Sequence, residues 1–390
     1  MEFSDNVASL EPSATLALAA RARALREEGR SVVDLSAGEP VWDTPRHAAE
    51  AGIRAIREGE TGYPPTPGIP ALRRAAATYL TETTRARIEE DRILVSAGVK
   101  QALFNCVFTL FGPGDEVLVP APCWTSYLPQ LRLARAEPVV VRCSWDDRFL
   151  PTPDALESAR SERTRGLLLN SPSNPTGEVY PRELLEEISS WAERHGIWVV
   201  TDEIYRLLHF GDGPAPSLLD VAELPERSVV LDGVSKAFAM PGWRIGFAAG
   251  PRELISEVSD LQSQTTSGAS TISQHAAAAA LADADLRREV VEGFLERLRR
   301  TRAMAVEELR GTPGIEVRPP AGGIFLFVRV QGDAPTDEVA ERLLVDAGVG
   351  SVPGEAFGGP GHLRFNLAVE PETMREGIRR IRGFFGGEGP

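Results

Sequence analysis

Short apolar runs alternate with longer amphipathic stretches over residues 71–283 of the chain. Apolar runs without a regular polar face are typical of strands buried on both sides, and the stretches between them have the length of helices. We expect seven strands, at residues 93–96, 116–119, 138–141, 166–169, 197–201, 229–231 and 245–248. The expected helices lie at residues 71–81, 99–111, 183–193, 255–263 and, rich in alanine, 274–283.

A different pattern follows a charged helical block at residues 285–310. It predicts strands at 323–330, 349–352 and 363–367 and helices at 337–346 and 371–384, which indicates a smaller α+β unit. The N-terminal arm and a helix at 15–28 are expected to pack with this unit. The predicted domains are an N-terminal arm with part of the small domain (1–45), a large domain (46–285) and a small C-terminal domain (286–390).

The fold class that follows from this order of elements is α/β. We predict a mostly parallel, seven-stranded sheet sandwiched by helices, with the smaller α+β domain beside it. A length of 390 residues agrees with more than one domain.

Composition excludes several kinds of partner. The formal net charge of −14 argues against nucleic acid or an anionic membrane, and no apolar stretch is long enough to span a bilayer. The three cysteines form no C-x-x-C pair, so neither a disulfide framework nor a zinc site is expected. Without the pattern of a secretory signal, a reducing, cytoplasmic location is expected.

Lysine is rare in this chain. Of 42 basic residues, only Lys100 and Lys236 are lysines. Arginine serves well on a solvated surface, but only an amine can form a Schiff base with an aldehyde once its pKa is lowered. Lys236 comes just after an apolar run at 228–231, a place that suits a Schiff-base lysine, and the alternative is that both lysines are leftover surface residues.

Two further motifs follow predicted strands. Residues 170–177 read NSPSNPTG, a sharp turn that would present the Asn174 amide where ligands of open α/β sheets bind. Asp202 ends an apolar run, and a buried carboxylate needs a cationic partner such as a pyridinium nitrogen. Tyr205, three residues on, offers a phenol. The alternatives are a structural turn for the first motif and a helix-capping Asp202 for the second.

Phosphate-binding groups occur at two places. The arginine fork of Arg244 and the hydroxyl of Ser235 flank the lysine motif SKAFAMPGWRIG at 235–246. At a strand-to-helix junction, the backbone N–H groups of Gly98, Val99 and Lys100 would point at an anion over the helix N-terminus.

Two more side chains are candidates for ligand contacts. The indole of Trp124 lies in a predicted loop and could stack on a flat ring, although a core position is the commoner fate of tryptophan. Arg364 lies within an otherwise apolar strand, where it could hold a carboxylate or form an internal salt bridge.

Taken together, these motifs resemble the class I/II aminotransferases, which are fold type I enzymes that depend on pyridoxal 5′-phosphate (PLP). The resemblance covers almost the whole chain from Pro12 onward, and it is greatest to bacterial aspartate aminotransferases of the thermophile-type subgroup. The segments that carry it lie at residues 11–15, 37–40, 63–65, 100–105, 171–177 and 236–240.

The resemblance implies a role for each cofactor-binding position. Lys236 would form the Schiff base with PLP and move the proton in the reaction, while Asp202 would keep the pyridine nitrogen protonated. Tyr205 and Asn174 would bind the ring oxygen, and Trp124 would stack on the ring. The phosphate would be held by Gly98, Val99, Lys100, Ser235 and Arg244, and by Tyr63 of a neighbouring subunit, which implies a homodimer.

The resemblance also implies the substrate-binding positions. The α-carboxylate of the substrate would be bound by Arg364 and Asn174, beside Trp124 and helped by the backbone at Gly38. Lys100 would hold the distal carboxylate, with Ser13 and Thr15 closing over it.

The implied activity is transfer of an amino group between an L-amino acid, aspartate or glutamate, and a 2-oxo acid, by a ping-pong mechanism. Departures from the family pattern at Glu11, Ser9, Cys123 and the pair Phe365-Asn366 lie on the substrate side of the site, so the amino donor stays open. The alternatives are an aminotransferase for another amino acid in a specialised pathway and a PLP-dependent carbon–sulfur β-lyase. A regulator built on the same fold is less favoured, because only about a dozen residues precede Ser13.

Overall fold

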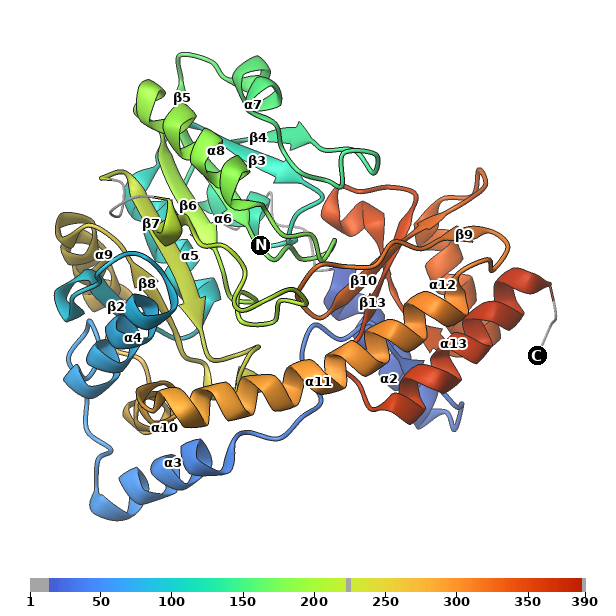
Figure 1. Ribbon diagram of the computed structural model, residues 1–390, viewed down its shortest axis with the longest axis horizontal. Helices are drawn as coiled ribbons and strands as arrows, with labels where there is room; N and C mark the ends of the chain where they lie inside the picture. The colour runs from blue at the N-terminus through green and yellow to red at the C-terminus, as the bar shows by residue number, and fades with distance from the viewer. Residues whose placement is uncertain (1–13, 222–225, 388–390) are drawn as a thin grey trace, which may run out of the picture.

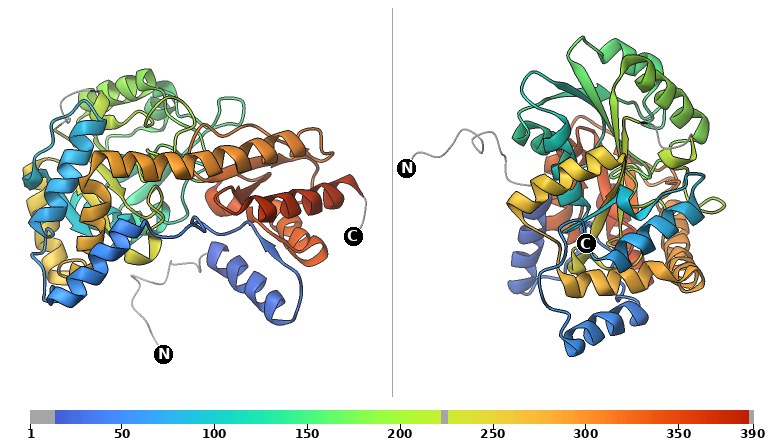
Figure 2. Two further views of the ribbon diagram at one scale, coloured as in Figure 1. Left: turned by 60° about the horizontal axis from the view of Figure 1, so that its bottom comes forward. Right: turned by 90° about the vertical axis from the view of Figure 1, so that its left-hand side faces the viewer.

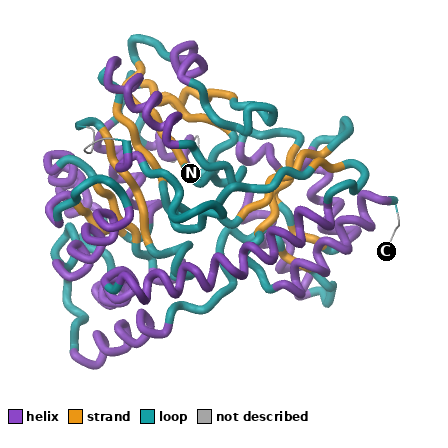
Figure 3. Tube along the Cα trace, in the orientation of Figure 1, coloured by secondary structure: helices purple, strands orange, loops and turns teal. Residues whose placement is uncertain are grey.

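The computed structural model describes residues 14–221 and 226–387. Its larger part is a seven-stranded sheet with helices on both faces (Figures 1 and 3), in the order β2-β8-β7-β6-β5-β3-β4. All strands run parallel except β8, which is antiparallel to both of its neighbours. The seven predicted strands are confirmed, as β2 (Ile93–Ser96), β3 (Glu116–Ala121), β4 (Glu137–Arg142), β5 (Thr164–Asn170), β6 (Trp198–Asp202), β7 (Ser228–Gly233) and β8 (Gly246–Ala249).

The central strands are buried almost throughout, as their apolar runs predict, whereas the edge strand β4 is partly exposed. The helices around this sheet are α3 (Arg46–Glu58), α4 (Pro70–Thr83), α5 (Val99–Leu110), α6 (Tyr127–Leu133), α7 (Pro153–Ala159), α8 (Arg182–His195), α9 (Arg252–Thr265) and α10 (Thr271–Ala282). Short 3-10 helices lie at η1 (Glu90–Arg92), η2 (Leu218–Asp220) and η3 (Pro241–Trp243).

The smaller part contains a four-stranded antiparallel sheet, in the order β12-β13-β10-β9, and a two-stranded parallel pair of β1 and β11. Its strands are β1 (Val33–Asp34), β9 (Ile315–Glu316), β10 (Phe325–Val330), β11 (Val349–Gly350), β12 (Val352–Pro353) and β13 (His362–Asn366). Its helices are α2 (Ala14–Glu27), α12 (Thr336–Ala347), η4 (Gly354–Phe357) and α13 (Pro371–Gly386).

Two predictions for the smaller part need correction. The single strand expected at 349–352 is two strands in different sheets, because β11 pairs with β1 while β12 pairs with β13. The strand expected from residue 323 begins at Phe325, since Gly323 has a φ of +74°, a left-handed conformation that interrupts an extended strand.

Helix α11 (Ala284–Leu309) joins the two parts of the molecule (Figure 2). It packs on α10 at its start and on α13 further along. The carboxylate of Asp283 caps it by accepting the N–H groups of Asp285 and Leu286. The expected domain boundary at residue 285 therefore falls on the first turn of a continuous helix, and the division into domains stays a prediction. No helix in the described ranges is long and apolar enough to cross a membrane.

The topology brings four chain segments to one edge of the large sheet. Strands β2, β5, β6 and β7 point the same way, so the residues at or just past their carboxyl ends meet there. These residues include Gly98, Asn174, Asp202 and Lys236.

Candidate functional site

Lys236 lies three residues beyond β7 and is half-buried. Its Nζ donates to the carbonyl oxygen of Gly38 at 2.6 Å and lies 6.0 Å from the centroid of the Tyr205 ring. Burial lowers the pKa of Lys236 to about 8, against the opposing effect of the nearby Glu39 carboxylate. A substantial fraction of this amine is therefore neutral just above neutral pH, the form that attacks a carbonyl.

Asp202 ends β6 and is only 3% exposed. Its carboxylate accepts the Tyr127 hydroxyl at 3.0 Å and the N–H of Ile204 at 3.2 Å. Burial raises the pKa of Asp202 to about 6, and none of the described cationic side chains forms an ion pair with it. The ionised form of this buried carboxylate would be stabilised by a ligand that carries a positive charge. The helix-capping alternative is not borne out, because no helix begins at Asp202.

Arg364 projects from β13 and is 3% exposed. Its guanidinium donates to Asn174 Oδ1 at 2.9 Å and to the Ser36 carbonyl at 2.8 Å, and it lies over the rings of Phe325 and Phe357 at 4.2 and 4.9 Å. Burial lowers the pKa of Arg364 to about 10. Among the described residues no carboxylate forms an ion pair with Arg364 and its Nε has no acceptor, so an internal salt bridge is ruled out there.

The start of α5 is shaped to receive an anion. The Gly98 N–H already donates to the Ser96 carbonyl at 2.7 Å, whereas the N–H groups of Val99 and Lys100 have no acceptor among the described residues. The guanidinium of Arg244 crosses this helix start, donating to Ala97 O at 3.3 Å. A Cβ on Gly98 would come within 2.6 Å of Arg244 Nη2, and φ of Gly98 is +87°, so the approach requires glycine.

Three further predicted residues, Ser235, Lys100 and Trp124, differ in how deeply they are buried. Ser235 is buried beside Lys236. Lys100 is exposed, but its Nζ lies 5.0 Å from the ring centroid of Trp124, and partial burial and Arg244 lower the pKa of Lys100. The half-buried indole of Trp124 meets the Tyr127 ring edge-on, at 5.4 Å between centroids.

Three predicted residues are not brought into this site by the described chain. Tyr63 is fully exposed. Ser13 lies outside the described residues, and Thr15 lies on α2 without a described side chain. Their predicted roles stay predictions.

Several contacts in the site could not be predicted from the sequence. Tyr127 holds Asp202 from 75 residues away, and Asn170 holds Asn174 by accepting its N–H at 2.7 Å. Ser36 contributes only its carbonyl to Arg364, which no side-chain pattern can reveal. The signal available for Tyr127 was its place three residues after Trp124, in the helix that follows the predicted loop.

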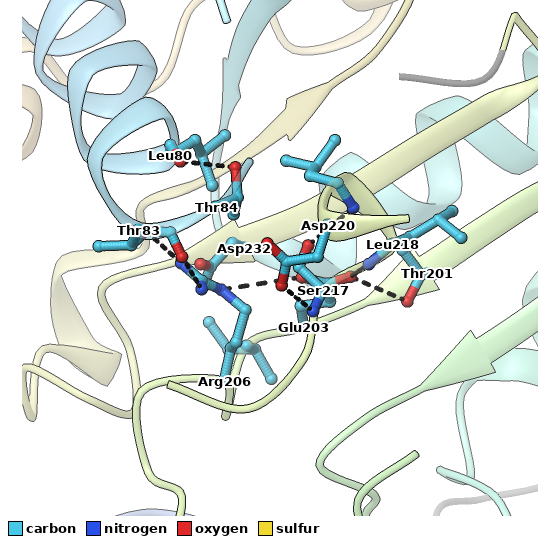
Figure 4. A network of polar contacts seen from close by, with 12 residues as sticks. Leu80, Thr83, Thr84, Thr201, Glu203, Arg206, Ser217, Leu218, Asp220 and Asp232 are labelled. Atoms are coloured by element: carbon cyan, nitrogen blue, oxygen red, sulfur yellow. Dashed lines mark hydrogen bonds and ion pairs between the residues drawn. The ribbon is translucent and has the colours of Figure 1, made fainter. Parts of the chain in front are cut away.

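A buried polar network around Arg206 includes Glu203, the residue that follows Asp202 in the chain (Figure 4). Arg206, 1% exposed, donates to the Tyr79 hydroxyl at 3.1 Å, which donates to Asp232 Oδ2 at 2.8 Å. Arg206 Nε lies 3.8 Å from Glu203 Oε2. Burial raises the pKa of Glu203 to about 7 and that of Asp232 to about 6, and the charge of Asp232 adds to the raised pKa of Asp202. The network therefore contributes to the electrostatic field at Asp202.

A doubly covered, mostly parallel sheet that carries an activated lysine past one central strand and an unpaired carboxylate on the next is the architecture of fold type I transferases. Comparison with known proteins supports this class. The family model for aminotransferase class I and II matches residues 30–381. A solved structure described as aspartate aminotransferase from Thermus thermophilus with maleate superposes with a TM-score of 0.93 at 38% identity, covering 98% of this chain and 100% of that one.

Curated relatives agree over nearly their whole length. A protein of Thermus aquaticus named probable aspartate/prephenate aminotransferase is 40% identical, over 97% of this chain and 98% of its own. A protein of Streptococcus mutans named asparagine–oxo-acid transaminase is 36% identical, over 98% of this chain and 99% of its own. The chain belongs to the aminotransferase class I and II family, and it is an aminotransferase.

Proposed function

We propose that the protein is a PLP-dependent aminotransferase that moves the amino group of aspartate or glutamate to a 2-oxo acid, oxaloacetate or 2-oxoglutarate, by a ping-pong mechanism. The observation that carries the proposal is that the Lys236 amine, with its lowered pKa, and the buried Asp202 carboxylate, which has no ion-pair partner among the described residues, lie at the same end of the large sheet. The relatives named for aspartate support the choice of substrate.

The residues present fit PLP. Asp202 suits the ring nitrogen, because it is buried and lacks a cationic partner. The free N–H groups at the start of α5 and the fork of Arg244 suit the phosphate, in a cradle that a Cβ on Gly98 would fill. Tyr205 and Asn174 would bind the ring oxygen, Trp124 the ring face and Ser235 the phosphate. When bound, PLP supplies an electron sink for the bonds at the substrate Cα.

Side chains of the protein itself bind and orient the substrate and move a proton. Arg364 binds the substrate α-carboxylate, and its carbonyl and amide acceptors at Ser36 and Asn174 hold the guanidinium in position. The rings of Phe325 and Phe357 exclude water from this pair. With a lowered pKa, the Lys236 amine is suited to take the proton from the substrate Cα as a general base.

Lys100 would bind the distal carboxylate of the donor. Its flexible ammonium lies over Trp124 rather than in a fixed fork, so it discriminates less sharply than an arginine. A second candidate, an aminotransferase for another amino acid, is favoured by the relative named asparagine–oxo-acid transaminase. Asparagine carries an amide where aspartate carries the carboxylate.

The active unit would be a homodimer in the cytoplasm. Tyr63 is fully exposed in a single chain, and apolar Ile53 and Ile56 on α3 are about half exposed. A dimer would cover these side chains and bring Tyr63 to the phosphate of the neighbouring subunit. Light scattering should then give twice the chain mass, and a monomer with full activity would contradict this arrangement.

A spectral titration tests the activity. Purified holoenzyme is mixed in turn with aspartate, glutamate, asparagine, alanine and cystathionine, and loss of the Schiff-base absorption is followed. We expect aspartate and glutamate to bleach the band at the lowest concentrations, and 2-oxoglutarate to restore it. A response to asparagine alone would support the second candidate, and release of pyruvate from cystathionine without a 2-oxo acid would indicate a lyase.

A further inference from the structure

A large cavity lies in the smaller part of the molecule, where α11, α12 and α13 end beside residues 30–31. It has a volume of about 1170 Å³. The ends of α11 and α13 that border it lie on the side away from the seven-stranded sheet (Figures 1 and 2). None of its lining residues belongs to the aminotransferase site described above.

The lining is strongly basic in an acidic protein. Seven arginines line the cavity against two acidic residues, Glu308 and Asp346, although the chain as a whole carries a formal charge of −14. Guanidinium groups gathered in one concave space repel one another, and low-dielectric walls focus their field. Such a cavity attracts anions.

Part of this charge is already paired. Arg375 and Arg379 bond glutamates of their own helix, and Arg380 also donates to the Ser31 carbonyl at 2.8 Å. Arg310, at the C-cap of α11, and Arg382, on α13, are exposed, and their guanidinium groups have no hydrogen-bond or ion-pair partner among the described residues. These two forks are free to bind a ligand.

Two further groups on the wall point to a ligand. Thr312 is 7% exposed, and its hydroxyl has no hydrogen-bond partner in the described chain, which is costly for a buried polar atom. The ring of Phe384 lies 5.5 Å from the Arg342 guanidinium and gives the cavity one flat apolar surface.

We propose that this cavity binds a small polyphosphate anion, either inorganic or carried by a nucleoside. Arginine forks bind phosphate oxygens bidentately, and several free or lightly paired forks around one space suit a ligand with more than one phosphate. The volume is of the size that holds a nucleotide. An extended polyanion such as nucleic acid is disfavoured, because the rest of the surface is acidic.

Calorimetric titration of the holoenzyme with tripolyphosphate, and separately with ATP, tests the proposal. In the holoenzyme PLP occupies the cofactor-binding site, and the absorption band of PLP reports any displacement of the cofactor by the added ligand. The double variant Arg310→Gln/Arg382→Gln should weaken binding of both ligands at least about tenfold, because each loses charge-assisted hydrogen bonds. The matched control, Arg297→Gln/Arg299→Gln, makes the same change in charge at exposed positions of α11 outside the cavity.

The control should bind both ligands nearly as wild type does. Thr312→Val preserves the shape of a buried side chain, so it should fold normally and weaken binding about threefold by removing one hydrogen-bond donor. If ATP binds more tightly than tripolyphosphate, the adenine base contacts Phe384. If both bind equally, the cavity recognises only the phosphate groups. The proposal is overturned if wild type binds neither ligand, if the two double variants lose affinity equally, or if binding displaces the cofactor.

Discussion

Replacing Arg364 with methionine should separate substrate binding from folding stability. Methionine has a similar length and keeps the apolar contacts with Phe325 and Phe357, but it removes the charge and the two hydrogen bonds to Ser36 and Asn174. In the ligand-free protein Arg364 is a buried cation without a carboxylate partner among the described residues. The substrate α-carboxylate would supply that partner.

The magnitudes follow from this environment. Burial moves the pKa of Arg364 from 12.5 to about 10, which corresponds to about 3 kcal/mol of unfavourable surroundings for the charge. Removing the charge relieves that cost but leaves two acceptors unpaired at about 1–3 kcal/mol each, so the free energy of unfolding should change by no more than about 3 kcal/mol. Removing one member of a buried charge pair costs about 2–5 kcal/mol in binding, or about 30- to 5000-fold in kcat/KM.

Two assays distinguish a substrate-binding role of Arg364 from a structural one. Urea unfolding of the ligand-free variant measures stability, and initial rates with aspartate and 2-oxoglutarate measure kcat/KM. Arg329→Met is the matched control, because Arg329 lies on the neighbouring strand β10, is exposed and pairs with Glu316 at 3.8 Å. A large loss of stability in Arg364→Met with unchanged kcat/KM would show that Arg364 is structural, and would refute this reasoning.

Three further predictions concern the neighbouring groups. Tyr127→Phe removes the donor to Asp202 Oδ2, so it should weaken cofactor affinity about tenfold in an equilibrium titration; unchanged affinity would count against the Asp202 assignment. Burial raises the pKa of Asp202 and Asp232 to about 6 and that of Glu203 to about 7. Because the folded protein then binds these protons more tightly than the unfolded chain, their protonation stabilises the fold fully below about pH 4, and this stabilisation is lost as the pH rises through 7. The urea midpoint of the ligand-free protein should therefore fall between about pH 5 and pH 7.5, and a rising midpoint would contradict the burial argument. Lys100→Ala should cost aspartate about 1–3 kcal/mol more than alanine in kcat/KM, whereas equal losses would limit Lys100 to its backbone N–H.

The large sheet could be predicted because each of its strands is a continuous apolar run. Helices α6 and α7 were missed because each has only seven residues, whereas α3 was missed although its alanines recur at helical spacing between charged residues. The short strands β1, β9, β11 and β12 were missed or merged, since two residues become a strand only through a distant partner.

The site divides in the same way. Lys236, Asp202, Asn174 and Arg364 could be chosen from the sequence, because each has a chemistry that is unusual at the end of, or inside, an apolar strand. Contacts made by backbone carbonyls, such as that of Gly38 with Lys236, leave no mark in a side-chain pattern. The network of Arg206 was equally hidden, because its partners come from distant segments.

Reduction of the holoenzyme with borohydride tests the central claim most directly. The chain has only two lysines, so a digest followed by mass spectrometry assigns any trapped Schiff base without ambiguity. We predict a pyridoxyl phosphate adduct on the peptide that contains Lys236 and none on the peptide that contains Lys100. An adduct on Lys100, or no adduct on an enzyme that turns over, would contradict the account.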